Sequence, residues 1–269
     1  MEPNLRKEPG TTTATKAGEL KQPCRWHVPR SWTISVLLAC VPPCQLASIL
    51  ETEPSNEILE RIAANNVKRY AIAFSVLREY KLRNLRFKKE ATVSVQGTYR
   101  PGMGMTYTIL ESSGSPKLVE IIGKVLATEA DTSSPSKLAS HSISPANYEV
   151  CLRGIETMAG RSCYVIDLLP KHKSKYLMKG TAWVDRSSYD VVRLEGATSA
   201  SVSMWIGTPH IEMEFSQIDG IWLPVRTGAL SSGLLLGTSQ LEIRYCDYVI
   251  NPDHPAPSGA AGLIEQSRP

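Results

Sequence analysis

The sequence lacks the short motifs that identify common enzyme classes. It has no Gly-x-Ser-x-Gly turn, no His-Glu-x-x-His pair, no P-loop and no Gly-x-Gly-x-x-Gly loop. Gly102 and Gly104 follow Pro101 and open no helical pattern, so they are expected in a turn. Without an arranged nucleophile, base or phosphate cradle, the sequence predicts a protein that is not an enzyme, with no cofactor, no catalytic residue and no metal site.

Cysteine is scarce in the part of the chain expected to fold. Three of the six cysteines precede residue 50, and no Cys-x-x-Cys pair occurs, which argues against a metal cluster. The other three are Cys151, Cys163 and Cys246. In a hairpin turning at Ala159-Gly160, Cys163 lies opposite Glu156, and Cys151 is then about 16 Å further along its strand at ~3.3 Å per residue. A disulfide between Cys151 and Cys163 is therefore excluded, and buried or idle thiols are expected.

An excess of charge of one sign is also lacking outside the N-terminal region. The formal net charge is +4, of which residues 1–48 contribute +3 and the remaining residues +1. With so small a net charge, the folded region has no broad basic surface that could bind the phosphate backbone of a nucleic acid. The sequence therefore predicts no nucleic-acid partner.

Residues 31–50 contain no charged side chain and follow Arg25 and Arg30. A basic flank, an apolar core and the small residues Ala47-Ser48 are typical of a cleaved secretory signal. The length also approaches that of a retained membrane anchor, although Pro42-Pro43 would interrupt a helix. Both alternatives predict an exported protein.

A third alternative for the same segment is a buried element of a cytosolic domain, which the disordered composition of residues 1–20 disfavours. A refinement of the signal interpretation is lipidation. Leu37-Leu38-Ala39-Cys40 resembles the end of a lipoprotein signal, in which Cys40 would carry the lipid. Residues 1–50 are therefore expected to be a disordered lead-in followed by a signal peptide or membrane anchor. Residues 252–269, in which Pro and Gly recur, are expected to be a flexible tail.

Helical periodicity occurs near the start and in the middle of the remaining chain. A helix is predicted from about Glu53, with Ser55 or Asn56 as its cap and apolar residues at helical spacing. Pro116 begins a second helix with an apolar stripe on one side. Residues 133–144 are small and polar and are expected to form a loop. The two stripes are Ile58, Leu59, Ile62, Ala63, Val67 and Leu118, Ile121, Ile122, Val125, Leu126.

Most other segments alternate apolar and polar residues, which predicts strands. The Asp219-Gly220 turn is the clearest hairpin signal. About nine to eleven strands without a βαβ rhythm indicate a mainly β (α+β) domain over residues 52–251, built as a meandering antiparallel sheet or incomplete barrel. The predicted strands are 86–100, 103–112, 147–156, 161–169, 175–185, 189–195, 209–218, 221–227 and 234–250.

Several turn and aromatic motifs of these strands resemble the outer-membrane lipoprotein-sorting (LolA-like) family within the LolA–LolB–RseB superfamily. The similar segments are GTAWVD at 180–185, YDVVRLEG at 189–196, PHIEMEF at 209–215 and IDGIWLP at 218–224, together with 84–90 and 160–165. The resemblance implies a half-open antiparallel β-barrel with helices over its concave face. It also implies a carrier of acyl chains or a sensor of envelope state. No ligand-contacting residue of the family matches a position here.

Apolar residues spaced by two along the strands are candidates for lining a hydrophobic trough on that face. The alternative is that they fill an ordinary closed core. Acyl chains gain about 0.8 kcal/mol per buried CH₂, so a trough needs shape and apolar surface more than polar contacts. The candidates are Tyr164, Ile166, Leu168, Trp183, Trp205, Ile211, Met213, Phe215 and Trp222.

Two polar patterns allow alternative interpretations. His210 alternates with Glu212 and Glu214 and could bind a metal, but a solvent-facing polar stripe is the favoured interpretation. Lys171, Lys173, Lys175 and Lys179 form a basic run that could meet anionic headgroups. Such runs more commonly keep a loop and an edge strand soluble.

These features together predict a periplasmic carrier or binding protein for lipid or lipoprotein acyl chains in outer-membrane lipoprotein sorting. It would be a monomer that passes its ligand to an inner- or outer-membrane acceptor protein. The alternative is an envelope-stress or regulatory module of the same fold that binds a membrane protein partner. A carrier would co-purify with lipid, whereas a regulator would hold a stable protein partner.

Overall fold

The computed structural model describes residues 52–202, 207–233 and 237–251, all within one compact unit. The predicted signal or anchor, with the candidate lipidation site Cys40, lies outside the described residues, as do Trp205 and the predicted tail. No helix in the described part of the chain is long and apolar enough to cross a membrane.

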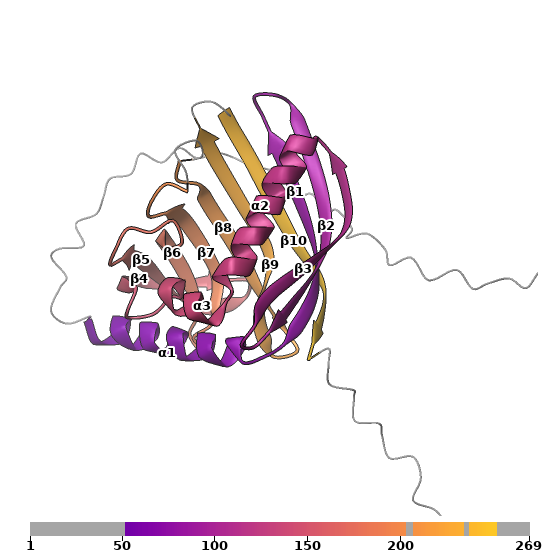
Figure 1. Cartoon of the computed structure of the whole chain (residues 1–269). Coiled ribbons are helices and arrows are strands. Elements are labelled where there is room, and N and C mark those ends of the chain that lie inside the picture. The colour runs from indigo at the N-terminus through magenta and orange to yellow at the C-terminus, as the bar shows by residue number, and fades with distance from the viewer. Residues whose placement is uncertain (1–51, 203–206, 234–236, 252–269) are drawn as a thin grey trace, which may run out of the picture. The chain divides into compact units, whose positions relative to one another are not determined.

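Ten antiparallel strands form one open sheet in the described ranges, which confirms the mainly β fold and the predicted strand number (Figure 1). The sheet is a meander from β4 to β10, followed by β1, β2 and β3 at the other side. The strands are β1 (Phe74–Asn84), β2 (Lys89–Arg100), β3 (Gly104–Gly114), β4 (Tyr148–Met158), β5 (Arg161–Pro170), β6 (Met178–Asp185), β7 (Val191–Thr198), β8 (His210–Ile218), β9 (Ile221–Gly233) and β10 (Gly237–Ile250).

The strand order requires the chain to cross the sheet once. β3 and β4 are consecutive strands but form the two opposite edges. The connection between them consists of α2 (Pro116–Thr132) and α3 (Pro135–His141), and α2 runs obliquely over the sheet (Figure 1). α1 (Thr52–Tyr70) precedes β1 and contacts β4. The topology therefore places helices over one face of the sheet.

Two helix predictions need correction. α1 begins at Thr52, so Ser55 and Asn56 lie inside the helix and neither is its cap. Residues 133–144 contain α3 where a loop was expected, because Pro135 stands at the first helical position after Ser134, where a proline costs no hydrogen bond. Tertiary packing also helps, since α2 and α3 contact each other.

One face of the sheet carries the core. The cross-strand row through Leu194, Met213 and Ile243 continues into β1 at Tyr80 and into β2 at Val93. Leu194 belongs to a cluster with Ile58, Leu59 and Ile62 of α1, whereas Ile243, Tyr80 and Val93 belong to a cluster with Leu118, Ile122 and Leu126 of α2. Because one row joins both clusters, α1 and α2 cover the same face.

The opposite face is an array of charged pairs. Arg226 lies between Glu214 and Glu242, at 3.3 Å and 3.5 Å, and Arg244 lies 3.2 Å from Glu242. These residues alternate with the core positions along β8, β9 and β10. The sheet therefore has the one-sided burial expected of an antiparallel sheet with one solvated face.

Strand β1 is the main element that sequence periodicity did not identify. Its inward positions include Arg78 among Val76, Tyr80 and Leu82, and all four are buried. A cation at a core position breaks the apolar alternation on which the strand prediction relies. The Asp219-Gly220 turn is confirmed, since both residues have positive φ, as a type I′ turn requires.

The cysteines follow the prediction only in part. Cys163 is buried, free and opposite Glu156, as the hairpin register predicted. Cys151 and Cys246 are disulfide-bonded, so the expectation of idle thiols is wrong for these two. A disulfide depends on the close approach of two Cβ atoms, which sequence spacing does not report.

Candidate functional site: two apolar pockets under the helices

The two helices cover different halves of the core face. α1 packs on the side of β4 to β7, and α2 packs on β1, β2, β3 and β10. β8 and β9, in the middle of the sheet, contribute no member to the α2 cluster, and the apolar side chains of β8 are only half-buried. Two pockets lie along this less covered strip.

The first pocket has a volume of about 360 Å³. It lies between the end of α1, helix α3 and the middle strands, and its wall is mostly apolar and aromatic. Pockets of roughly 300–1,000 Å³ with such walls are typical of small-molecule sites. Side chains that line it include Tyr70, Phe74, Leu194, Met213, Phe215 and Leu223.

The second pocket has a volume of about 350 Å³ and lies under α2. Ile121 and Val125 of α2 form one wall, and Leu82, Ile211 and Leu241 form the opposite one. Its floor is made of small residues, which leave the space that larger side chains would fill. These small residues are Ala229, Ser231, Gly233, Gly237 and Ser239.

The helix stripe of α2 explains why this pocket exists. Leu118, Ile122 and Leu126 are buried against the sheet. Ile121 and Val125 are only partly buried and point to the pocket side. One apolar stripe thus serves both as the anchor of α2 and as the wall of a cavity.

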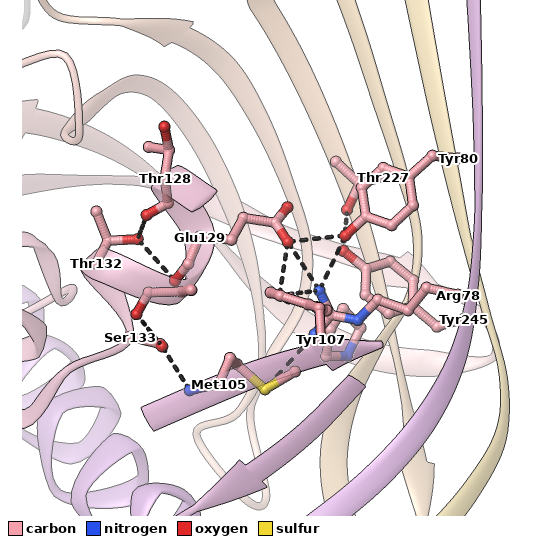
Figure 2. A network of polar contacts seen from close by, with 12 residues as sticks. Arg78, Tyr80, Met105, Tyr107, Thr128, Glu129, Thr132, Ser133, Thr227 and Tyr245 are labelled. Atoms are coloured by element: carbon pink, nitrogen blue, oxygen red, sulfur yellow. Dashed lines mark hydrogen bonds and ion pairs between the residues drawn. The ribbon is translucent and has the colours of Figure 1, made fainter. Parts of the chain in front are cut away.

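A buried ion pair holds the end of α2 beside the first pocket (Figure 2). Arg78 donates from Nη1 to Glu129 Oε2 at 2.9 Å. The hydroxyls of Tyr80 and Tyr107 donate to the same carboxylate oxygen, each at 2.8 Å. Burial, followed by the adjacent carboxylate, raises the pKa of both hydroxyls well above the usual range, so they remain donors.

Aromatic rings surround the same guanidinium. Its carbon lies 4.8 Å from the centre of the Tyr245 ring and 5.2 Å from that of Tyr107, which are cation–π distances. Arg78 lines the first pocket, and its Nε is buried without a hydrogen-bond partner. The mostly apolar pocket therefore has a buried guanidinium in its wall, at the point where α2 joins the sheet.

The structure separates the predicted trough residues into groups. Ile166 and Leu168 are fully buried beneath α1, with Tyr164 packed against the same cluster. Met213 and Phe215 line the first pocket, and Ile211 lines the second. All six therefore belong to the helix-covered face, and three of them reach a cavity.

The described tryptophans lie elsewhere. Trp222 is buried with Cys163 and Val192, and Trp183 packs against this small cluster. The indole of Trp183 donates to Glu156 at 2.9 Å, and Arg161 lies over the Trp222 ring at 5.0 Å. Neither tryptophan lines the two pockets.

A group of possible metal ligands lies on the solvated face. Ligand atoms of Glu195, His210 and Glu212 lie within 4.8 Å of one another. Arg193 approaches the same carboxylates, with Nη2 at 3.1 Å from Glu195 and 3.7 Å from Glu212. A guanidinium in this position already offsets part of the negative charge of the two carboxylates, which favours an ion-pair array over a cation site.

Sequence reasoning did not find the pocket residues contributed by the helices and by β1. Tyr70, Phe74 and Arg78 come from the end of α1 and from β1. The sequence signal that could have indicated this part of the pocket was Arg78 itself. A cation between Val76 and Tyr80 on the inward face of a strand must have a buried partner. The partner, Glu129, could not be identified because it lies 51 residues away on a helix.

Comparisons with known proteins give fold likenesses. No protein-family model matches the sequence, and no curated protein matches it. The fold is similar to that of an outer membrane lipoprotein-sorting protein domain from Vibrio parahaemolyticus, with 14% identity, 76% of this chain and 95% of that chain covered, and a TM-score of 0.43.

Two further solved structures have a similar fold. A LolA superfamily protein from Nitrosomonas europaea has 14% identity over 72% of this chain and 92% of that chain, with a TM-score of 0.41. A DUF1329 family protein from Desulfovibrio piger has 10% identity over 76% of this chain and 95% of that chain, with a TM-score of 0.39. These likenesses concern the fold alone.

Proposed function

We propose that this chain is an exported, LolA-like binding protein whose helix-covered face accommodates lipid or lipoprotein acyl chains. The observation that carries the proposal is the pair of apolar pockets along the middle of the sheet, where neither α1 nor α2 fills the core face. A buried CH₂ group gains about 0.8 kcal/mol, so apolar walls alone can bind an alkyl chain.

The geometry supports an alkyl ligand over a compact polar one. The walls are mostly Leu, Ile, Met and aromatic side chains, and the buried arginine in the first pocket, Arg78, is already paired with Glu129. Ile211 in the second pocket and Met213 in the first are two residues apart on β8, so the two pockets follow one strand. An elongated ligand could therefore extend along β8 if the side chains between the pockets move.

The proposal includes a periplasmic location and an acceptor protein in the inner or outer membrane. The basic residues and uncharged run of the N-terminal 50 residues support export. A regulatory module that binds a membrane protein partner is the second candidate. It is favoured by the buried Arg78–Glu129 pair, which holds α2 on the sheet. If a partner broke this pair, α2 could shift between two positions.

Lipid extraction from natively purified protein, followed by mass spectrometry, tests the proposed function. A carrier contains bound lipid, and added palmitate displaces a fluorescent hydrophobic probe from it. The variants Ala229→Phe and Met213→Trp fill the second and first pocket and should lower probe binding at least about ten-fold. A regulator contains no lipid in a fixed ratio to protein, and it retains a protein partner during purification.

Matched controls lie on the opposite face of the same strands. Leu230→Phe and Ser216→Trp introduce the same aromatic side chains at exposed positions next to Ala229 and Phe215. They should leave probe binding unchanged. If the pocket-filling variants bind the probe as the controls do, the pockets are not the binding site and the proposal is wrong.

A further inference from the structure

One end of the sheet has a charge composition that differs from the rest of the domain. Because the strands are antiparallel neighbours, the strand ends that are joined by the connections β1–β2, β5–β6, β7–β8 and β9–β10 all lie at the same end of the sheet. These four connections contain five Lys or Arg and no Asp or Glu. The connections at the opposite end contain one basic residue, Arg186, and two acidic residues, Asp190 and Asp219.

The basic side chains at this end are exposed. They come from two connections, 85–88 and 171–177, and are Arg86, Lys88, Lys171, Lys173 and Lys175. Lys89 and Lys179, the neighbouring strand residues, are exposed as well. Among acidic side chains on the adjoining strand ends, Glu90 is paired with Lys81 and Arg83, and Glu149 is exposed. The end therefore carries an excess of positive charge.

Large apolar side chains are exposed among these cations. Leu85 and Phe87, in the β1–β2 turn, are 54% and 52% exposed. Tyr176 and Val202 are also exposed, in the β5–β6 and β7–β8 connections. Single exposed apolar residues are ordinary on a protein surface. Apolar and aromatic tips interleaved with cations, and with no acidic residue in the same connections, are typical of segments that enter a lipid interface.

The same end forms part of the second pocket. Its wall includes Lys175, Tyr176 and Val202, together with Gly237 at the start of β10. The side chain of Arg86 packs against Gly237, since a Cβ on this glycine would lie 2.8 Å from that of Arg86. The two basic connections thus flank one apolar cavity.

From these observations, we propose that this end of the sheet docks on an anionic phospholipid bilayer. Leu85 and Phe87 enter the headgroup region, and the surrounding Lys and Arg side chains contact lipid phosphates. The second pocket then faces the bilayer, which provides a short path for an acyl chain. This last step rests on the proposed lipid-binding function, whereas the docking itself does not.

Vesicle co-sedimentation of the full chain tests the docking. The probes are vesicles of equal parts phosphatidylglycerol and phosphatidylcholine, and vesicles of phosphatidylcholine alone. We expect binding to the anionic vesicles that weakens with added salt, because exposed charges are screened. Each basic residue near an anionic surface contributes about five-fold in affinity. Lys88→Gln/Lys89→Gln should therefore weaken binding at least about ten-fold, and Leu85→Ser/Phe87→Ser should weaken it in both low and high salt.

Control variants change the same residue types away from this end. Lys68→Gln/Lys137→Gln removes exposed charges from α1 and α3, and Val67→Ser/Met103→Ser removes apolar side chains that are 71% and 69% exposed. These variants should bind vesicles as the unmodified chain does. Thermal unfolding of every variant verifies that the sheet is intact.

The outcomes separate the docking from the lipid-binding function. Equal binding by the end variants and the controls overturns the docking, as does equal affinity for both vesicle types. Capture of a membrane protein through this end without vesicle binding overturns it too. Palmitate displacement of the hydrophobic probe in solution should be unchanged in the end variants. If the unmodified chain docks on vesicles but never binds palmitate, the docking stands and the proposed function fails.

Discussion

Arg78 of β1 and Glu129 of α2 form an ion pair, with 2.9 Å between Nη1 and Oε2, at the point where the helix meets the sheet. The arginine side chain is only 8% exposed, and that of the glutamate is 29% exposed. A charge buried to this extent requires a partner. The pair therefore ties the position of α2 to the state of the first pocket, which Arg78 lines.

Removal of the carboxylate tests this connection. Glu129→Ala should lower the free energy of unfolding by about 3 kcal/mol, because it leaves Arg78 buried without its counter-charge and deprives Tyr80 and Tyr107 of their acceptor. Urea unfolding measures the change. Glu120→Ala, which breaks the exposed pair with Lys124 on the same helix, should leave stability essentially unchanged. Equal effects of the two substitutions would show that the buried pair does not anchor α2.

Asp185, the last residue of the GTAWVD segment, gives a prediction of pH dependence. Burial alone would raise the pKa of its carboxyl group, but hydrogen bonds from Ser187, Ser188 and Arg161 outweigh burial and lower the pKa from 3.8 to about 2. A carboxyl group with a lowered folded-state pKa contributes stability above its unfolded-state pKa and loses it as the pH falls. The shift corresponds to about 2 kcal/mol at pH 7.

Asp185→Asn should therefore be less stable than the unmodified chain by about 2 kcal/mol at pH 7. This difference should shrink as the pH falls below 3.8 toward 2, where the native carboxyl also becomes protonated. Denaturant unfolding at pH 7, 4 and 2.5 measures the difference. If the difference in unfolding free energy stays constant over this pH range, the charge of the Asp185 carboxylate does not stabilise the turn.

Two glycines provide opposite predictions for the same substitution. A Cβ on Gly180 would lie 2.0 Å from the carbonyl oxygen of Glu195 on the paired strand, so Gly180→Ala should destabilise the sheet by about 1–3 kcal/mol. A Cβ on Gly123, in α2, would meet no atom within 4 Å, so Gly123→Ala should stabilise the chain by about 0.5–1 kcal/mol. Thermal unfolding measures both. If both substitutions change the stability in the same direction, the close approach of β6 and β7 at Gly180 is contradicted.

The predicted trough residues should divide between core and pocket wall. Ile166→Ala removes a fully buried side chain and should cost about 3–4 kcal/mol. Ile211→Ala enlarges a pocket that already exists and should cost less, about 1–2 kcal/mol, while changing the affinity for a hydrophobic probe. Urea unfolding and probe titration on the same samples measure the two effects. If Ile166→Ala alters probe affinity and Ile211→Ala does not, the assignment of wall and core is reversed.

Local sequence patterns were sufficient for much of the fold. The alternation of apolar and polar residues predicted nine of the ten strands, and the Asp219-Gly220 turn was predicted from its residue types. The stripe from Leu118 to Leu126 predicted α2. These signals are local, since periodicity and turn chemistry depend on residues a few positions apart. Strand β1 and helix α3 were missed because their local pattern is weak and distant contacts stabilise them.

The candidate site depended on tertiary structure. Sequence periodicity placed Met213 and Phe215 on one face, and the fold confirms a shared face, but periodicity does not distinguish a filled core from a pocket wall. The difference arises from where α1 and α2 lie, and from the small residues beneath α2.

By itself, the sequence determined the type of fold, the register of its clearest hairpins and the expectation of an exported chain. Only the tertiary structure decided that Arg78 meets Glu129, that two cavities remain under the helices, and that the basic connections share one end of the sheet. The physical reason is the distance along the chain over which each interaction acts. Backbone preference and side-chain alternation act within a few residues, whereas ion pairs, cavities and surface charge depend on strands and helices that lie far apart along the chain.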